Sequence, residues 1–188
     1  MTFLDMPSSD PDGLRYYQRA ALESVQKDLQ SHRSTMAVMA TGLGKTRLAS
    51  ALIKHWKGPV LLLAPYKELV EQARIDLERA TGEYVEVEQA TRRCMPTTRI
   101  VVGCVASVCQ EARLERMGRD RFTLIVEDEG HHAVSKTNRR ILDWFSDAKV
   151  LFITATPDRG DGKAMGLVCD SVAYVMDILA GIDAVYLV

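Results

Sequence analysis

The chain alternates between short runs of consecutive apolar residues and longer amphipathic stretches. Most of the apolar runs lack the every-second-residue pattern of a half-exposed strand. Continuous runs of this length are typical of strands that are buried on both faces. The pattern therefore predicts five buried strands, over residues 35–40, 59–65, 99–105, 123–127 and 149–156.

The stretches between these runs have helical periodicity, and they predict helices over residues 16–30, 45–56, 67–80 and around 107–117. In the third stretch, apolar residues recur at the spacing of one helical face, and we expect that face to meet the core: Leu69, Ala73, Leu77 and Ala80. Strands that alternate with helices of this length indicate an α/β fold with a mostly parallel sheet and helices on both faces. Ligands of such sheets bind beyond the carboxyl ends of the strands.

The length of 188 residues suits one domain with a sizeable core. We expect a single domain over residues 1–188, in which residues 1–13 form a flexible lead-in. Apolar residues make up 47% of the chain and charged residues 26%, which excludes a disordered protein. No stretch approaches the roughly 20 apolar residues of a membrane span, and the N-terminus does not resemble a secretory signal. We expect a cytoplasmic protein with no membrane partner.

The net charge of −1 gives no overall basic field that would attract nucleic acid, so any such binding has to come from a local surface. The pairs Arg92-Arg93 and Arg139-Arg140 are interpreted as solvated faces. The four cysteines form no C-x-x-C pair, which favours buried or half-buried free thiols over a zinc site.

The first predicted strand runs into the stretch TGLGKT. Two glycines allow successive amide N–H groups to point at a phosphate, and the following helix adds its positive N-terminal end. Lys45 would supply charge to the β- and γ-phosphates and Thr46 a hydroxyl for Mg²⁺. The alternative is a helix entry that merely needs glycine. The predicted nucleotide loop comprises Thr41, Gly42, Leu43, Gly44, Lys45 and Thr46.

The stretch LIVEDEGHH places three carboxylates at the end of a predicted strand. Asp128 is the expected Mg²⁺-holding residue, through water because Mg²⁺ dehydrates reluctantly. Glu129 is then placed to orient and deprotonate an attacking water. Glu127 has no assigned role and is expected behind these two or at the surface. Two alternatives are an acidic turn without chemistry and a metal site that includes His131 and His132.

Taken together, these stretches resemble the first RecA-like domain of superfamily 2 helicases of the DExH type. The resemblance covers nearly the whole chain in the family's motif order: LRYYQ (14–18), MATGLGKT (39–46), APYKELVEQA (64–73), VVGCVASV (101–108), EDEGHH (127–132) and TATPDRGDG (154–162). The last motif is most similar to the branch that contains restriction-enzyme motor subunits and DNA repair helicases. The departures are Met39 in place of the strict first glycine, Gly130 in place of the common alanine, and Cys104 where serine or threonine is frequent.

The resemblance implies a RecA-like P-loop domain that binds ATP and Mg²⁺ and couples ATP hydrolysis to nucleic-acid binding, with DNA favoured over RNA. It implies a second RecA-like domain, in cis or in trans, whose arginines complete the ATP site; nothing after Val188 provides one. Alternatives are a nucleotide- or nucleic-acid-binding module without turnover of its own, and a P-loop ATPase that acts on no nucleic acid. The TATP and APYKEL stretches disfavour the last of these.

Roles for further residues follow from the same resemblance. Lys45, Asp128 and Glu129 are the expected catalytic residues, and the expected adenine contacts are Arg15 and Gln18. Coupling of the ATP site to the nucleic acid is assigned to His131, Thr154 and Thr156, although TATP also suits a hydroxyl-capped strand end. Contacts to nucleic-acid phosphates, without base reading, are assigned to Pro65, Tyr66, Lys67 and Ser107. Tyr66 is equally interpretable as a plain surface aromatic.

Overall fold

The computed structural model describes residues 10–128, 135–155 and 169–176. The helices are α1 (Tyr16–Ser31), α2 (Lys45–His55), α3 (Lys67–Thr81), α4 (Val105–Val108), α5 (Glu111–Met117) and α6 (Lys136–Trp144). The strands are β1 (Ser34–Met39), β2 (Val60–Ala64), β3 (Val85–Glu88), β4 (Ile100–Cys104), β5 (Leu124–Asp128), β6 (Lys149–Thr154) and β7 (Ser171–Met176).

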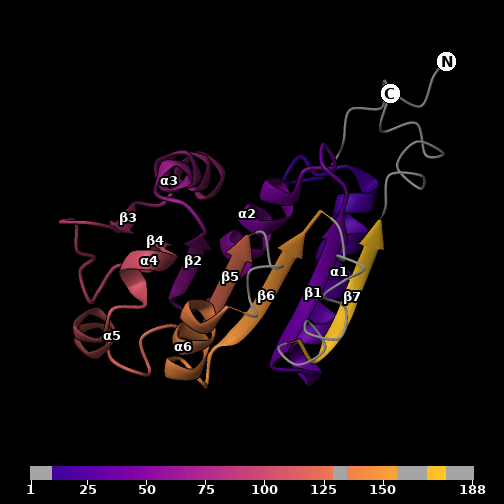
Figure 1. Ribbon diagram of the computed structural model, residues 1–188. Helices are drawn as coiled ribbons and strands as arrows, with labels where there is room; N and C mark the ends of the chain where they lie inside the picture. The colour runs from indigo at the N-terminus through magenta and orange to yellow at the C-terminus, as the bar shows by residue number, and fades with distance from the viewer. Residues whose placement is uncertain (1–9, 129–134, 156–168, 177–188) are drawn as a thin grey trace, which may run out of the picture.

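The strands form one sheet in the order β3-β4-β2-β5-β6-β1-β7, and every strand pairing in the described part of the chain is parallel (Figure 1). This confirms the predicted parallel sheet. The five predicted strands are β1, β2, β4, β5 and β6, and each lies within two residues of its predicted bounds. All five are internal to the sheet, as their continuous apolar runs required.

Both strands that the sequence analysis missed, β3 and β7, lie at the edges of the sheet. Neither reads as a continuous apolar run. Strand β7 is mostly half-buried or exposed, whereas β3 is mostly buried but alternates valine with glutamate, and its buried Glu88 pairs with Arg113 and Arg116. Helix α6 was missed because its sequence, KTNRRILDW, is largely polar and buries only one narrow face. The helix predicted around 107–117 is split into α4 and α5.

The helices cover the two faces of the sheet, as predicted. Helices α1, α2 and α3 pack on one face and contribute Leu22, Leu48 and Val70 to its core. Helices α4, α5 and α6 pack on the other (Figure 1), where Leu114 and Ile141 join the second core. Strands with both faces buried separate these cores, so side chains of successive strand residues enter them alternately.

The buried face of α3 differs from the predicted one. Val70 and Leu77 are fully buried and Ala73 is half-buried, whereas Leu69 is 43% exposed and Ala80 is exposed. The helix is turned so that Val70 faces the sheet and Leu69 borders a cavity beside the phosphate loop. The predicted helical periodicity was correct. Leu69 and Val70 are both apolar and adjacent in the chain, so only the packing of the helix on the sheet decides which of the two is buried.

Residues 10–13, the described part of the predicted lead-in over 1–13, make ion pairs and hydrogen bonds. Residues 1–9 lie outside the described part, and the flexibility of the lead-in stays a prediction. Arg19 bridges Asp10 and Asp12, at 2.6 and 2.9 Å, and its hydrogen bonds lower the pKa of Asp10 to about 2. Asp12 also contacts Lys54 and His55 of α2, at 3.0 and 2.7 Å. Burial raises the pKa of Asp12, but hydrogen bonds from these partners outweigh it and lower the pKa.

Across the described residues, no helix is both long and apolar enough to span a bilayer. The four cysteines are free thiols: Cys94 and Cys104 are buried, and Cys109 and Cys169 are half-buried, as the sequence predicted.

Candidate nucleotide site and nucleic-acid edge

The loop between β1 and α2 has the backbone geometry of an anion cradle. Gly42 and Gly44 both have left-handed backbone conformations, with φ of 89° and 83°, which favour glycine. Helix α2 begins directly after Gly44, so its unpaired N–H groups and positive end face the loop. Thr41 and Thr46 are exposed and Lys45 is half-exposed, whereas Leu43 is fully buried and anchors the loop in the core.

Helix α1 contacts this loop through two hydrogen bonds. The Leu43 carbonyl accepts hydrogen bonds from Gln18 Nε2 at 2.9 Å and from the Tyr17 hydroxyl at 3.1 Å. The other atom of the Gln18 amide, Oε1, accepts from the Arg15 backbone N–H at 2.9 Å, and the Gln18 side chain is only 2% exposed. A Cβ atom at Gly44 would lie 2.3 Å from Gln18 Nε2, so the second glycine is required by this contact as well as by its φ.

Gln18 therefore holds the phosphate loop, a role that the sequence analysis missed. The adenine contacts assigned to Gln18 and Arg15 stay predictions, and Arg15 is exposed at the start of α1. The sequence holds one weak signal for this role: Gln18 lies in the first turn of the helix that precedes the phosphate loop. The contact with Leu43 itself arises only when that helix packs against the loop.

A cavity of about 150 Å³ brings together Lys45 and Thr46 from the phosphate loop and Asp128 from the end of β5. Helix α3 closes its other side with Leu69, Ala73 and further residues. An ammonium group, a hydroxyl and a carboxylate thus meet at the carboxyl edge of the sheet. This is the donor set that a magnesium nucleotide needs, so the residues present fit that ligand. Glu129, the predicted base, lies outside the described residues.

A second, more open cleft of about 520 Å³ shares Thr46 with this cavity and extends along α2. Its lining includes Leu14 from the segment before α1, Arg47 from α2, and Asp76 and Arg79 from α3. None of these four was predicted to be a site residue. Arg47 directly follows the phosphate-loop motif, but Asp76 is brought to the site only by the packing of α3 on α2, and no local pattern indicates it.

Glu127 is buried, with 1% of its surface exposed, which excludes the surface position that the sequence analysis allowed. One carboxyl oxygen accepts a hydrogen bond from Asn138 of α6, and the other, Oε2, has no hydrogen-bond partner among the described residues. Burial raises the pKa of Glu127 to about 8, against a smaller lowering by the Asn138 hydrogen bond. Because neighbouring strand residues point to opposite faces, Glu127 faces α6 while Asp128 faces the nucleotide cavity.

The residues expected to couple the ATP site to the nucleic acid are described only in part. Thr154 is the last residue of β6 and is buried. Strand β6 lies beside β5, and the adjacent Ile153 pairs with Asp128, as expected for neighbouring motifs. His131 and Thr156 lie outside the described residues, as does His132, so their roles stay predictions.

The predicted nucleic-acid contacts lie at the same carboxyl edge, after the neighbouring strands β2 and β4. Tyr66 is 58% exposed and Lys67 is exposed at the start of α3, while Pro65 is half-buried. Ser107 is only 9% exposed, and its hydroxyl accepts a hydrogen bond from the Ala90 backbone N–H at 3.2 Å. The Ser107 hydroxyl is thus engaged within the protein, and its contact with phosphate stays a prediction.

A groove of about 240 Å³ extends this edge onto α6. Its lining combines Pro65 and Tyr66 with Ser135, Thr137 and Asn138 from the first turn of α6. The sequence analysis did not name these three polar residues, because α6 itself was not predicted.

Comparison with known proteins adds a family. Residues 12–159 match the family described as the type III restriction enzyme, res subunit. IRC3 of Saccharomyces cerevisiae, provisionally named an ATP-dependent helicase, is 30% identical over 90% of this chain and 27% of its own length. The DNA 3'-5' translocase XPB2 of Sulfurisphaera tokodaii is 27% identical over 80% of this chain and 32% of its own length. The chain thus spans about a third or less of these relatives.

Among solved structures, the fold matches a fragment of a type I restriction enzyme HsdR subunit, provisionally identified, from Vibrio vulnificus YJ016. The TM-score is 0.70 at 25% sequence identity, over 90% of this chain and 31% of that one.

Proposed function

We propose that this chain, which belongs to the type III restriction enzyme res subunit family, is the first motor domain of an ATP-dependent DNA helicase or translocase. It corresponds to the N-terminal RecA-like domain of superfamily 2 helicases. In this proposal, ATP hydrolysis is coupled to nucleic-acid binding once a second RecA-like domain joins the first, in cis or in trans. The cytoplasmic location expected from the sequence remains a prediction.

One observation carries the proposal: the cavity shared by Lys45, Thr46 and Asp128. The backbone N–H groups of residues 42–46 bind the phosphates, and the Lys45 ammonium neutralises charge on the outer ones. Thr46 and Asp128 are the residues that would hold Mg²⁺, which when bound neutralises charge on the β- and γ-phosphates. Glu129 follows Asp128 in the chain, and in the proposal it takes the proton of the attacking water.

Hydrolysis also requires a cation against the charge that develops on the transferred phosphate. In the family this cation is an arginine of the second domain. Arginine fingers contribute about 10³–10⁵ in rate, or roughly 4–7 kcal/mol of barrier. We therefore expect the 188-residue chain alone to bind nucleotide but to hydrolyse it very slowly, with little stimulation by DNA and no unwinding.

The proposed partner is DNA. The support is the relative XPB2, which is named a DNA translocase, together with the exposed Tyr66 and Lys67 beside the nucleotide cavity. Phosphate contacts from hydroxyl, ammonium and backbone N–H groups do not read bases, so a translocase is expected to bind many sequences equally.

Titration calorimetry with Mg²⁺-ADP tests the nucleotide site. Lys45→Ala removes the one side-chain cation among the described residues that line the cavity, so we expect a loss of affinity of at least tenfold. Lys27→Ala is the matched control, since Lys27 is an exposed lysine on α1. Equal affinity of wild type and Lys45→Ala would refute the assignment of the site.

Turnover assays separate the proposed motor domain from a binding module without turnover. ATP hydrolysis is measured for the chain alone, with duplex DNA, and with DNA plus a separately expressed second RecA-like domain of a relative. The motor-domain proposal expects stimulation only in the third mixture. Turnover of several ATP per second by the chain with DNA alone would refute the missing-arginine reasoning. Nucleotide binding without turnover in any mixture would favour the binding module.

A further inference from the structure

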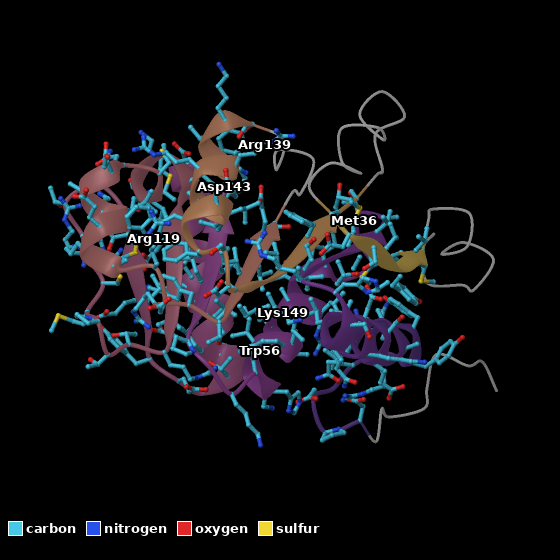
Figure 2. The ribbon with its side chains drawn as sticks, turned by 90° about the horizontal axis from the view of Figure 1, so that it is seen from below. Met36, Trp56, Arg119, Arg139, Asp143 and Lys149 are labelled. Carbon is cyan, nitrogen blue, oxygen red and sulfur yellow. The ribbon has the colours of Figure 1, made fainter. Side chains whose placement is uncertain are left out.

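The outer face of α6 carries a basic surface that none of the assigned roles uses. A shallow depression of about 420 Å³ is lined by Arg119, Lys136, Arg139, Arg140, Asp143 and Trp144. We call these six residues the α6 basic surface. Figure 2 shows Arg139 and Asp143 along α6, with Arg119 beyond them toward α5, on the side of the molecule away from Trp56.

The local charge differs from that of the whole protein. Among the described residues, four cations and a single carboxylate line the α6 basic surface, although the formal net charge of the chain is −1. Arg140 contacts Glu111 at 3.2 Å, but both side chains are more than half exposed, so water and salt weaken this pair. A phosphate group can therefore replace Glu111 as the partner of Arg140 at little cost.

Helical spacing explains how the cations gather. Lys136, Arg139 and Arg140 stand at i, i+3 and i+4, so they share one face of α6, while Asn138 and Ile141 face inward. Arg119, which lies just beyond α5, stacks on Trp144 with its guanidinium carbon 4.1 Å from the ring centroid. This stacking fixes one guanidinium in place before any ligand binds, which lowers the entropy lost on binding.

The surface is continuous with the proposed nucleic-acid edge. The groove at Tyr66 is lined on its other side by the first turn of α6, including Ser135 and Thr137. Lys136 lies between these two residues in the chain and lines the basic surface. A nucleic acid with one strand in the groove therefore has the cations of α6 beside it.

We propose that the α6 basic surface binds the phosphate backbone of double-stranded nucleic acid as a second contact, beside the strand bound at the Tyr66 groove. The inference rests on the proposed function, because it assumes that the Tyr66 edge meets nucleic acid. Guanidinium groups bind phosphate oxygens through paired hydrogen bonds, and three of the four cations are arginines. Ser135 and Thr137 line the groove and Lys136 lines the surface, so the two features flank the start of α6. In the proposal, one strand of a duplex lies in the groove and the other on the cations.

The test is fluorescence anisotropy of the full chain with a labelled duplex of about 30 base pairs, between about 50 and 200 mM salt. Each cation that contacts phosphate contributes about 0.9 to the slope of log affinity against log salt. We expect Lys136→Ala/Arg139→Ala to lower the affinity about tenfold at low salt and the slope by about 2. The control, Lys27→Ala/Lys57→Ala, removes the same charge from exposed residues elsewhere and should change the affinity less than twofold.

Equal losses in the two double variants would show a general charge effect and would overturn the proposal. Equal wild-type affinity for polyglutamate, or for a single strand of the same length, would overturn the assignment to duplex. Lys136→Arg/Arg139→Lys keeps both charges and should keep the binding. Its failure to bind while nucleotide affinity stays normal would also count against a contact made through charge.

Trp144 supplies a local readout, because the chain contains only one other tryptophan, Trp56. In a Trp56→Phe background, a phosphate bound by the Arg119 guanidinium next to the Trp144 ring should change the emission of Trp144, whereas Mg²⁺-ADP should not. Unchanged emission at saturating duplex overturns the proposal. If nucleotide binding persists and Tyr66→Ala weakens duplex binding while Lys136→Ala/Arg139→Ala does not, the proposed function stands and the α6 basic surface is refuted.

Discussion

Replacing Glu127 with glutamine should stabilise the protein at neutral pH. The carboxyl is 1% exposed, has one hydrogen-bond partner in Asn138, and has a pKa raised by burial from 4.5 to about 8. Glutamine has the same shape and stays neutral at every pH. Its carbonyl can accept the Asn138 hydrogen bond, so the change removes the ionisation and keeps the packing.

The sign and size of the effect follow from proton linkage. The unfolded chain releases the Glu127 proton above pH 4.5, whereas the folded protein holds it until about pH 8. The contribution of Glu127 to the free energy of unfolding of the wild type is therefore highest below pH 4.5, and it falls as the pH rises toward 8. Each pH unit in this interval lowers the free energy of unfolding by about 1.36 kcal/mol. Between pH 4.5 and 7 the protein therefore loses roughly 3 kcal/mol of stability.

Urea denaturation at several pH values measures this difference. Glu127→Gln should be more stable than wild type by roughly 3 kcal/mol at pH 7, and the two should converge near pH 4.5. Glu115→Gln, at an exposed position of α5, is the matched control and should follow the wild type at every pH. If wild type and Glu127→Gln show the same pH dependence, Glu127 is ionised in the folded protein and the reasoning from burial is wrong.

Three further predictions concern the site and the sheet. Gln18→Ala should reduce the preference for ATP over GTP and, because Gln18 Nε2 holds the Leu43 carbonyl, should weaken the binding of both nucleotides; calorimetry with each nucleotide measures this, and unchanged affinities would show that neither an adenine contact nor the Leu43 hydrogen bond contributes to nucleotide binding. Glu129→Gln should leave nucleotide affinity within about twofold and lower turnover in the presence of a second domain by about 10²–10⁴; parallel losses of affinity and rate would argue against a base. Gly103→Ala should destabilise the fold by about 1–3 kcal/mol in urea denaturation, because its Cβ atom would lie 2.5 Å from Val108 Cγ2, where β4 packs against α4; a neutral result would show that α4 can shift.

The local parts of the structure were predictable from the sequence. Internal strands such as β1 and β6 are buried on both faces, so a continuous apolar run is sufficient to identify them. The phosphate loop was recognisable because its geometry requires glycine at two positions and a helix start immediately after them. Strand β7 and helix α6 were not predictable in this way, because a partly covered element needs only a few apolar residues. Strand β3 was not predictable because glutamates interrupt its buried valines.

Other features depend on the tertiary structure alone. Lys45 and Asp128 are far apart in the chain, and they share a cavity because β5, β6 and β1 are adjacent in the sheet and end at the same edge. The burial of Glu127 against Asn138 required α6 to fold back over β5. The residue pair Arg139-Arg140 was interpreted from the sequence as a solvated face. In the folded protein, α6 places this pair beside Arg119 in one basic depression.

The physical reason is the range over which each signal acts. Backbone preference and apolar periodicity act within a few residues, so the sequence displays them directly. Burial, pKa and the meeting of charges depend on which elements become neighbours, and that is set by the order of strands and the packing of helices across the whole chain.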